Sequence, residues 1–166
     1  MDGGTERGIA ILQARMAIET LMHGYGERVD GGDMEGVGEL FQQGRVIMPD
    51  GAEHVGPQAI RDAYVAAVQF YDADGNRAPY QRRETTPGTR HLVFNHIFEF
   101  NNRVTAANTR VVFLVTQVID GDLVNVLSGR YVDEFAKDLG GWHFRTRRIL
   151  IDQLGDNSHH SAASAG

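Results

Sequence analysis

TRHLVFNHIFEF, residues 89–100, alternates along its length in the manner of a β-strand. Residues an even number apart on a strand share a face. One face would carry His91, Val93, Asn95 and Ile97, and the other would carry Leu92, Phe94, His96, Phe98 and Phe100. Both faces are largely apolar, so neither suits water. We therefore expect helices on one face and a second copy of the chain on the phenylalanine face, with His96 in that contact.

The segments on either side of this strand predict an α+β domain. After it, turns at NNR, DGD and KDLGG separate three further strands over 104–119, 123–135 and 142–151. Before it, apolar residues at three- and four-residue spacing predict a helix over 5–29. A short helix capped by Asp33 follows, then a strand at RVIMP and a third helix over 57–71 that begins at a proline. Helices first and a meander afterwards is an α+β order.

The length of 166 residues is that of one domain, which we place at 5–152. Residues 153–166 are small and polar, so we expect a flexible tail in which His159 and His160 are not ligands. The aperiodic segment 72–88 is long for a connection and favours a functional loop or lid.

Composition excludes several classes of function. The 16 basic and 22 acidic residues give a net charge of −6, and the basic residues are scattered, which argues against nucleic acid as a partner. The chain has no cysteine, hence no disulfide, thiolate metal site or cysteine nucleophile. No apolar run approaches membrane-spanning length and no secretory signal begins the chain, so we expect a cytoplasmic protein without a membrane partner. A metal pair of His91 and His96 is not expected, since residues five apart on a strand face opposite ways.

A resemblance to a known family rests on motifs and their order. The chain contains, in sequence, YGERVDGGDMEGVGELF, GPQAIRDAY, TRHLVFN and SGRYVDEFAKDLGGWHFRTRR. From about residue 8 to 152 this order resembles the SnoaL-like branch of the nuclear transport factor 2-like superfamily. The resemblance implies a cystatin-like cone: a curved antiparallel sheet, mixed at its edge, packed against three N-terminal helices around a deep apolar pocket. The family includes scytalone dehydratase, γ-hexachlorocyclohexane dehydrochlorinase, polyketide cyclases and the small subunits of ring-hydroxylating dioxygenases.

The resemblance also implies site residues. In the dehydratase and the dehydrochlorinase, an aspartate after the first helix orients a histidine that acts as the base, and these positions match Asp30 and His91. An arginine that lines the dehydrochlorinase pocket matches Arg147. The polar positions of a later dehydratase strand fall near Tyr131. The dehydratase's second histidine has no equivalent at 104–119.

The residues themselves leave alternatives open. Neutral imidazole suits proton abstraction, and a carboxylate on one ring nitrogen leaves the other free as a base. His91 could instead be an ordinary strand histidine, and Asp30 could cap the DGGD turn. Tyr25 could be a core tyrosine or a donor to a substrate oxygen. Asn95 could bind a substrate oxyanion or tie neighbouring strands together.

We therefore expect a lyase, isomerase or cyclase that needs neither cofactor nor metal and acts on a small, mostly apolar cyclic or polyketide-like molecule. His91 would be the base and Asp30 its orienting partner. The expected substrate-binding residues are Tyr25, Asn95, Arg147 and Tyr131. The alternatives are the non-catalytic small (beta) subunit of a ring-hydroxylating dioxygenase and a pocket that only binds. In each case the chain is expected to form a homodimer or a larger homo-oligomer through the outer sheet face.

Overall fold

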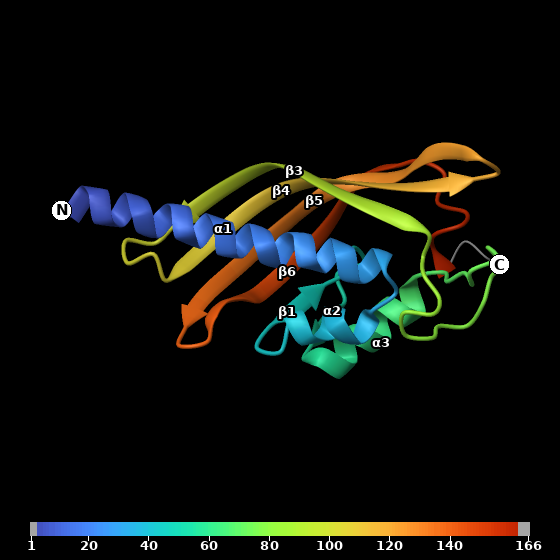
Figure 1. Ribbon diagram of the computed structural model, residues 1–166, viewed down its shortest axis with the longest axis horizontal. Helices are drawn as coiled ribbons and strands as arrows, with labels where there is room; N and C mark the ends of the chain where they lie inside the picture. The colour runs from blue at the N-terminus through green and yellow to red at the C-terminus, as the bar shows by residue number, and fades with distance from the viewer. Residues whose placement is uncertain (1–2, 163–166) are drawn as a thin grey trace.

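The computed structural model describes residues 3–162 and places three helices around a sheet that ends in a four-stranded meander (Figure 1). The helices are α1 (Gly3–Asp30), α2 (Met34–Leu40) and α3 (Pro57–Ala67). The strands are β1 (Arg45–Ile47), β2 (Glu53–Val55), β3 (Thr89–Phe100), β4 (Ala106–Ile119), β5 (Asp122–Asp138) and β6 (Gly141–Leu154). The third helix is shorter than predicted, because Val68 already has extended backbone.

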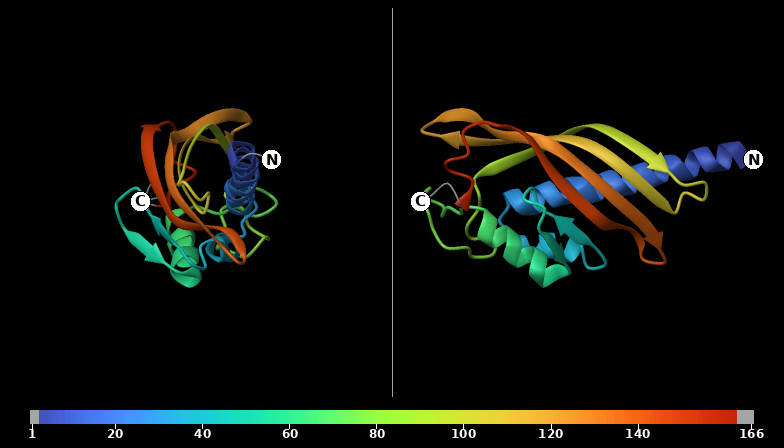
Figure 2. Two further views of the ribbon diagram at one scale, coloured as in Figure 1. Left: turned by 90° about the vertical axis from the view of Figure 1, so that its left-hand side faces the viewer. Right: turned by 180° about the vertical axis from the view of Figure 1, so that it is seen from behind.

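The strands form one sheet in the order β2-β1-β6-β5-β4-β3. Neighbouring strands are antiparallel except for β1, which runs parallel to β6, so the sheet is mixed near one edge as predicted. The sheet is strongly curved, and α1 runs along its concave side with α2 and α3 at one end (Figure 1). Seen end-on, α1 closes the open side of the curve (Figure 2). The predicted α+β cone is therefore the observed architecture.

Helix α1 is held by one buried stripe. The stripe consists of residues spaced three or four apart, namely Ala14, Ile18, Met22, Tyr25 and Val29. All of them except Ala14 belong to one core cluster with inward-facing residues of β4 and β5, including Val111, Phe113, Val115, Tyr131 and Phe135. Burying a large apolar side chain stabilises by about 1.5–3 kcal/mol, so packing against the sheet rather than helix propensity fixes α1.

A β-bulge at Asn95 interrupts the alternation of β3. The pairing of β3 with β4 changes register between Phe94 and Ile97, and Asn95 has a φ of 55°. An extra residue in one strand exchanges the two faces beyond it. The two faces predicted for this strand are therefore wrong from Asn95 onward.

The residues after the bulge face α1 instead of forming an outer phenylalanine face. These residues are His96, Phe98 and Phe100, all partly buried. The guanidinium of Arg15 on α1 lies 4.9 Å from the centre of the Phe98 ring. The ring centres of His23 on α1 and His96 are 6.2 Å apart. The expectation that His96 and two of these phenylalanines form an outer contact is thus contradicted, as is the argument that His91 and His96 face opposite ways.

The outer face of β3 is nonetheless apolar in its middle, between the exposed Arg90 and Glu99. It carries Leu92, Phe94 and Ile97, which are 47%, 41% and 50% exposed. Their paired neighbours on β4 include the half-buried Val112 and Leu114. A smaller apolar patch than predicted therefore remains on the convex side of the sheet.

The C-terminal segment, residues 155–162, is bound to the domain, whereas the sequence predicted a flexible tail. Strand β6 continues to Leu154, and Ser161 then pairs with Val68 just beyond α3. The backbone N–H of Gln69 donates to the carbonyl of His160 at 2.9 Å. Hydrogen bonds to residues far away in the sequence cannot be predicted from the small polar residues of the segment itself. The rest of the predicted tail, residues 163–166, lies outside the described residues.

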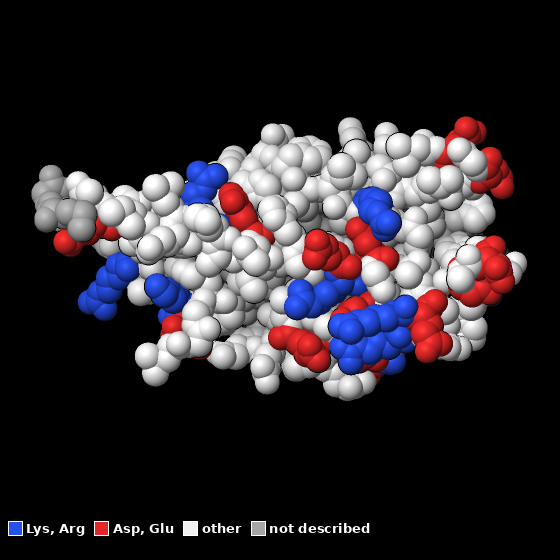
Figure 3. Space-filling model, viewed as in Figure 1, with Lys and Arg blue, Asp and Glu red and all other residues white. Residues whose placement is uncertain are grey.

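The segment 72–88 is fixed against α2. Asp33 accepts hydrogen bonds from Arg82 at 2.7 Å and from Arg83 at 2.6 Å, and the Tyr80 hydroxyl donates to Glu35. Basic and acidic side chains lie side by side on this face (Figure 3). Within residues 3–162, no helix is both long and apolar enough to span a bilayer.

Candidate functional site

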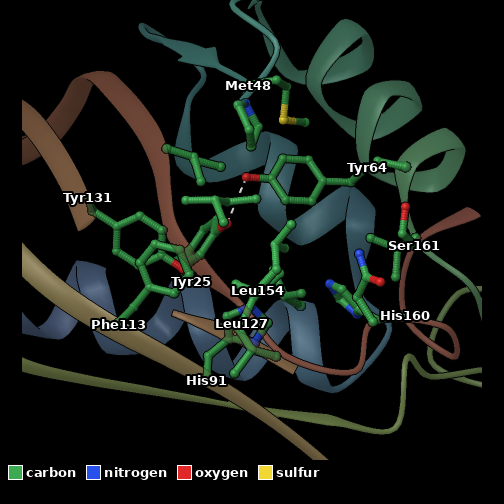
Figure 4. Close-up of a pocket in the computed structure, with 18 residues that line it drawn as sticks. Tyr25, Met48, Tyr64, His91, Phe113, Leu127, Tyr131, Leu154, His160 and Ser161 are labelled. Carbon is green, nitrogen blue, oxygen red and sulfur yellow. Dashed lines mark hydrogen bonds between the residues drawn. The ribbon is translucent and has the colours of Figure 1, made fainter. Parts of the chain in front are cut away.

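A cavity of about 210 Å³ lies where the C-terminal half of α1, α3 and the C-terminal segment meet the concave face of the sheet (Figure 4). Most of its wall is aliphatic or aromatic. The side chains that bring polar atoms to it include Tyr25, Tyr64, His91, Tyr131 and His160. No residue of the 72–88 segment is part of this wall, so the segment is not the lid that its length suggested. The C-terminal segment forms part of the wall instead, through Asn157, His160 and Ser161.

Asp30 and His91 meet at the cavity wall, as predicted. The His91 ring nitrogen Nδ1 lies 2.6 Å from Asp30 Oδ1, and the His91 backbone N–H donates to Asp30 Oδ2 at 2.8 Å. The Thr89 hydroxyl donates to Oδ1 at 2.7 Å. Only 8% of the His91 side chain and 10% of the Asp30 side chain are exposed. The carboxylate is therefore held by three donors from the start of β3.

The electrostatics of this pair set the form of the His91 ring. Burial raises the pKa of Asp30, but the hydrogen bonds from His91 and Thr89 outweigh burial and bring the pKa below its ordinary value. Asp30 is consequently a carboxylate at neutral pH, and it can only accept. The hydrogen of a neutral His91 ring then sits on Nδ1, and Nε2 keeps its lone pair.

One glycine is required beside the dyad. At Gly26 on α1 an added Cβ would make only an ordinary contact, 3.4 Å from the Cβ of His91. Gly32, in the turn after α1, has a φ of 68°, and a Cβ there would lie 2.0 Å from the Thr85 carbonyl oxygen. The turn that ends α1 beside β3 therefore depends on Gly32.

Two tyrosine hydroxyls form a pair beside the dyad. The Tyr25 and Tyr64 oxygens are 2.7 Å apart, and the centres of the Tyr25 and His91 rings are 6.3 Å apart. Burial raises the pKa of Tyr25 and that of Tyr64, which also lies next to Tyr25. The Tyr25 hydroxyl also lies beside that of Tyr131, whose pKa is raised by burial as well. All three hydroxyls keep their hydrogens at neutral pH, and two contacts among three hydroxyls leave one hydrogen free to donate to a ligand.

Arg147 lies beneath the tyrosines and is not among the residues that line the cavity, contrary to prediction. It is completely buried and forms a bidentate ion pair with Asp133, at 3.0 and 2.6 Å. Its guanidinium carbon is 4.2 Å from the Tyr25 ring centre and 4.0 Å from that of Tyr131. Burial lowers the pKa of Arg147, but Asp133 more than offsets this, so the side chain stays charged.

Another bulge lies in β6 just before Arg147. Between β5 and β6, residue 134 pairs with 146 whereas 135 pairs with 144, which leaves Arg145 as the extra residue. Arg145 is exposed while Arg147 is buried, so the two do not share a face as a regular strand would require. The pocket arginine implied by the resemblance is here a core ion pair.

The remaining predicted residues divide between the cavity and the outside. Tyr25 and Tyr131 line the cavity, and Tyr131 stacks on Phe113 with ring centres 4.2 Å apart. Asn95 is exposed at the β3 bulge and is not among the lining residues, so its predicted role in binding is not supported. Its positive φ, rather than contact with a ligand, is its evident structural feature.

Sequence reasoning missed several polar residues of the cavity, among them Tyr64 and His160. Tyr64 was placed only in the apolar spacing of the third helix, and its distance from Tyr25 in the sequence hid the hydroxyl pair. His160 was assigned to a flexible tail, yet its ring lines the cavity. No local pattern identifies either residue. Among residues 3–162 there is no cluster of three or more histidine, cysteine or acidic side chains arranged to hold a metal ion.

Comparison with known proteins gives the family and the fold. The pattern of the SnoaL-like domain family matches residues 10–148. No curated protein sequence matches the chain.

Three similar solved structures come from Novosphingobium aromaticivorans. An NTF2-like protein with a cystatin-like fold is 21% identical, with a TM-score of 0.68 over 97% of this chain and 92% of that one. A provisionally named scytalone dehydratase is 22% identical, with a TM-score of 0.67 over 90% of this chain and 91% of that one. The beta subunit of a provisionally named aromatic-ring-hydroxylating dioxygenase is 19% identical, with a TM-score of 0.63 over 87% and 93%. These likenesses confirm the predicted fold, and a fold alone does not give a reaction.

Proposed function

The chain belongs to the SnoaL-like domain family, and we propose that it is a cofactor-free lyase, isomerase or cyclase that removes a proton from a small, mostly apolar ring compound. The observation that carries this proposal is the Asp30–His91 hydrogen bond of 2.6 Å at the wall of the apolar cavity. An ionised carboxylate fixed on one imidazole nitrogen is the arrangement that a general base needs. Burying an ionised carboxylate costs free energy unless the group has a strong partner or serves a function.

The proposed reaction begins at Nε2 of His91. This atom takes a proton from a substrate carbon, and the electron pair of the broken C–H bond forms a carbon–carbon double bond. In an elimination, a neighbouring leaving group departs with its bonding pair. In an isomerisation or a ring closure, the negative charge moves to a carbonyl oxygen. Asp30 stabilises the imidazolium that results, because its carboxylate accepts from the ring N–H.

Tyr25 is suited to hold a substrate oxygen on which negative charge develops. Its hydroxyl is paired with that of Tyr64, and the charged guanidinium of Arg147 lies 4.2 Å from the centre of its ring. A donor fixed in a dry site stabilises a developing oxyanion more than water does. Tyr131, against the Tyr25 ring at a centre distance of 5.6 Å, would contact the apolar part of the substrate.

The size of the cavity narrows the substrate class. An apolar cavity of about 150 Å³ accommodates benzene in an engineered protein. The cavity here, about 210 Å³, has room for one ring with a few substituents. A single-ring compound therefore fits better than a multi-ring polyketide.

The two alternative functions use less of this site. The likeness to a dioxygenase beta subunit rests on the fold at 19% identity. Neither a subunit that only holds a partner nor a pocket that only binds needs a carboxylate directed at a cavity histidine. These alternatives become preferred if the chemistry proposed here fails its test.

We also propose that a second copy of the chain covers the outer face of β3. Leu92, Phe94 and Ile97 are between 41% and 50% exposed and lie together on the convex side of the sheet. A contiguous exposed apolar patch is a common feature of an interface between proteins. The expected assembly is a homodimer or a larger homo-oligomer.

A panel of single-ring compounds tests the proposed reaction. Each compound carries a C–H bond next to a carbonyl, with or without a hydroxyl or halide leaving group one carbon further on. Products formed by the wild type and by His91→Gln are separated by chromatography and identified by mass spectrometry. We expect the variant to lose on the order of 10²-fold in kcat with a much smaller change in KM, because the base acts in the chemical step.

His96→Gln is the matched control, since His96 lies on the same strand but is not among the residues that line the cavity. It should keep the wild-type kcat. A panel compound turned over equally well by His91→Gln and by the wild type would contradict the proposal. Tight binding of panel compounds without any product would favour the binding-only pocket.

A further inference from the structure

The C-terminal segment is fixed to the body of the protein through its backbone. Two buried glutamine side chains and one tyrosine reach its carbonyl groups. Gln69 Nε2 donates to the carbonyls of Ser158 and Ser161, at 3.0 and 2.6 Å. Tyr71 and Gln117 both donate to the carbonyl of residue 159, at 2.7 and 3.2 Å.

The carbonyl group of His160 is held as well, because the Gln69 backbone N–H donates to its oxygen at 2.9 Å. Four successive carbonyl groups, 158–161, are thus satisfied by residues far away in the sequence. Gln69 and Gln117 are each only 5% exposed. This anchoring places the His160 side chain at the cavity and makes no use of its ring.

The ring of His160 is polar, enclosed and unpartnered. Its Nδ1 is buried and forms no hydrogen bond with any of the described residues. Because no acceptor reaches Nδ1, this atom could carry the ring's hydrogen only as an unsatisfied buried donor, which is rare in folded proteins. Because Nδ1 has no accessible surface, the part of the ring that lines the cavity is its outer edge, which carries Nε2.

The protonation of the ring follows from its surroundings. Burial lowers the pKa of His160 to about 4, with a further lowering from His91 and a small opposing effect of Asp30. At neutral pH the ring therefore has a single N–H. On Nδ1 that N–H would be a buried donor without an acceptor, which is rarer than an unpaired lone pair. The hydrogen accordingly sits on Nε2, which faces the cavity.

We propose that His160 is a substrate-binding residue whose Nε2–H donates to an oxygen on the ring compound. This rests on the proposed function for the identity of the cavity as the substrate site. In Figure 4, Tyr25 and His160 stand apart among the residues that line the cavity, with Leu154 drawn between them. The substrate class is therefore a single ring with two oxygen substituents, one directed at Tyr25 and the other at His160.

Binding of two simple phenols tests this without any turnover. Resorcinol has two hydroxyl groups on one ring and phenol has one, and their affinities are measured by calorimetry at pH 7. We expect the wild type to prefer resorcinol, and we expect His160→Phe to lose about five- to tenfold of the resorcinol affinity, as befits one net hydrogen bond. The phenol affinity should change by less than about twofold.

Two further variants make the result specific. His160→Gln keeps an N–H donor and should restore most of the preference for resorcinol. His159→Phe changes the exposed neighbour, whose ring is not part of the cavity wall, and should behave as wild type. Melting curves of all variants show whether each is folded. If His160→Phe is not folded, the relative affinity of His160→Gln for resorcinol and phenol decides the question instead.

Equal resorcinol affinity in the wild type and in His160→Phe would overturn the assignment of His160, as would the absence of resorcinol binding to the wild type. Neither binding result depends on whether His91 acts as the base. If His91→Gln abolishes turnover while His160→Phe binds resorcinol normally, the inference about His160 fails and the proposed reaction stands. If His91→Gln keeps full turnover while His160→Phe loses resorcinol affinity, the inference about His160 stands and the proposed role of His91 fails.

Discussion

Replacing Asp30 with Asn should reverse the proton arrangement of the His91 ring. The Asp30 carboxylate receives three donors: the ring Nδ1 and the Thr89 hydroxyl at Oδ1, and the His91 backbone N–H at Oδ2. An asparagine has one acceptor oxygen and one NH₂ group. The backbone N–H cannot become an acceptor, so the amide oxygen should turn toward it and the NH₂ toward Nδ1. His91 must then keep its lone pair on Nδ1 and carry its hydrogen on Nε2.

The expected loss of stability follows from these contacts. A hydrogen bond to a charged group contributes about 1.5–3 kcal/mol, and a neutral one contributes about 0.5–1.5 kcal/mol. Exchanging charged for neutral partners at this site should cost about 1–3 kcal/mol in the free energy of unfolding at pH 7. For a chain of this size, that is a fall of roughly 3 to 10 °C in melting temperature.

The pH dependence has a definite sign. The hydrogen bonds at Asp30 outweigh burial and lower its folded pKa below the ordinary value of about 3.9. The stability that the carboxylate contributes is therefore fully present above about pH 4 and is lost as the pH falls through the folded pKa. The part of the difference between wild type and Asp30→Asn that comes from the Asp30 charge should shrink below about pH 4, as the wild-type carboxyl group takes up its proton.

Urea unfolding at pH 7, 5 and 3.5 measures this difference, and NMR of histidine-labelled protein reports which ring nitrogen carries the hydrogen. Asp122→Asn, at the exposed start of β5, is the control and should alter neither quantity. The reasoning is refuted if Asp30→Asn keeps the hydrogen of His91 on Nδ1 and unfolds at the wild-type urea concentration at pH 7.

Three other changes test the fold and its assembly. Phe94→Asp should reduce the mass found by sedimentation velocity to that of a monomer, whereas Leu139→Asp, at a fully exposed hairpin tip, should leave it unchanged; equal masses would place the contact elsewhere. Arg147→Met should cost about 3–5 kcal/mol in guanidinium unfolding, because it leaves Asp133 buried without its partner, and a second change of Asp133 to Leu should restore much of that loss; additive losses would contradict a coupled pair. Gly32→Ala should lower the unfolding midpoint clearly, since its Cβ would lie 2.0 Å from a backbone oxygen, and a midpoint within error of wild type would show that the turn can adjust.

Periodicity was sufficient to predict most of the fold. The stripe from Ala14 to Val29 and the four runs of the meander are local patterns, and each gave an element of the right type. The bulges at Asn95 and Arg145 could not be predicted in this way, because both residues stand in runs that lack a glycine or proline as a signal. A single extra residue exchanges the faces of everything beyond it. The predicted outer face of β3 was wrong for that reason.

The site was predictable only where a family position identified it. Asp30 and His91 are far apart in the sequence, and their meeting came from the resemblance rather than from spacing. Tyr64 and His160 reach the cavity through tertiary contacts that no local pattern displays. His160 in particular depends on Gln69, a residue just after α3 with no distinctive neighbours in the sequence.

Exchange of a substrate carbon-bound hydrogen with deuterated water tests the central claim most directly. A single-ring compound that the wild type converts is incubated in D₂O with wild type, His91→Gln or His96→Gln, and the loss of its acidic C–H signal is followed by proton NMR. If Nε2 of His91 is the base, exchange and conversion by His91→Gln should fall by on the order of 10²-fold or more, with His96→Gln near the wild-type rate. Exchange by His91→Gln at the wild-type rate would show that another group removes the proton, or that the cavity does not catalyse this step.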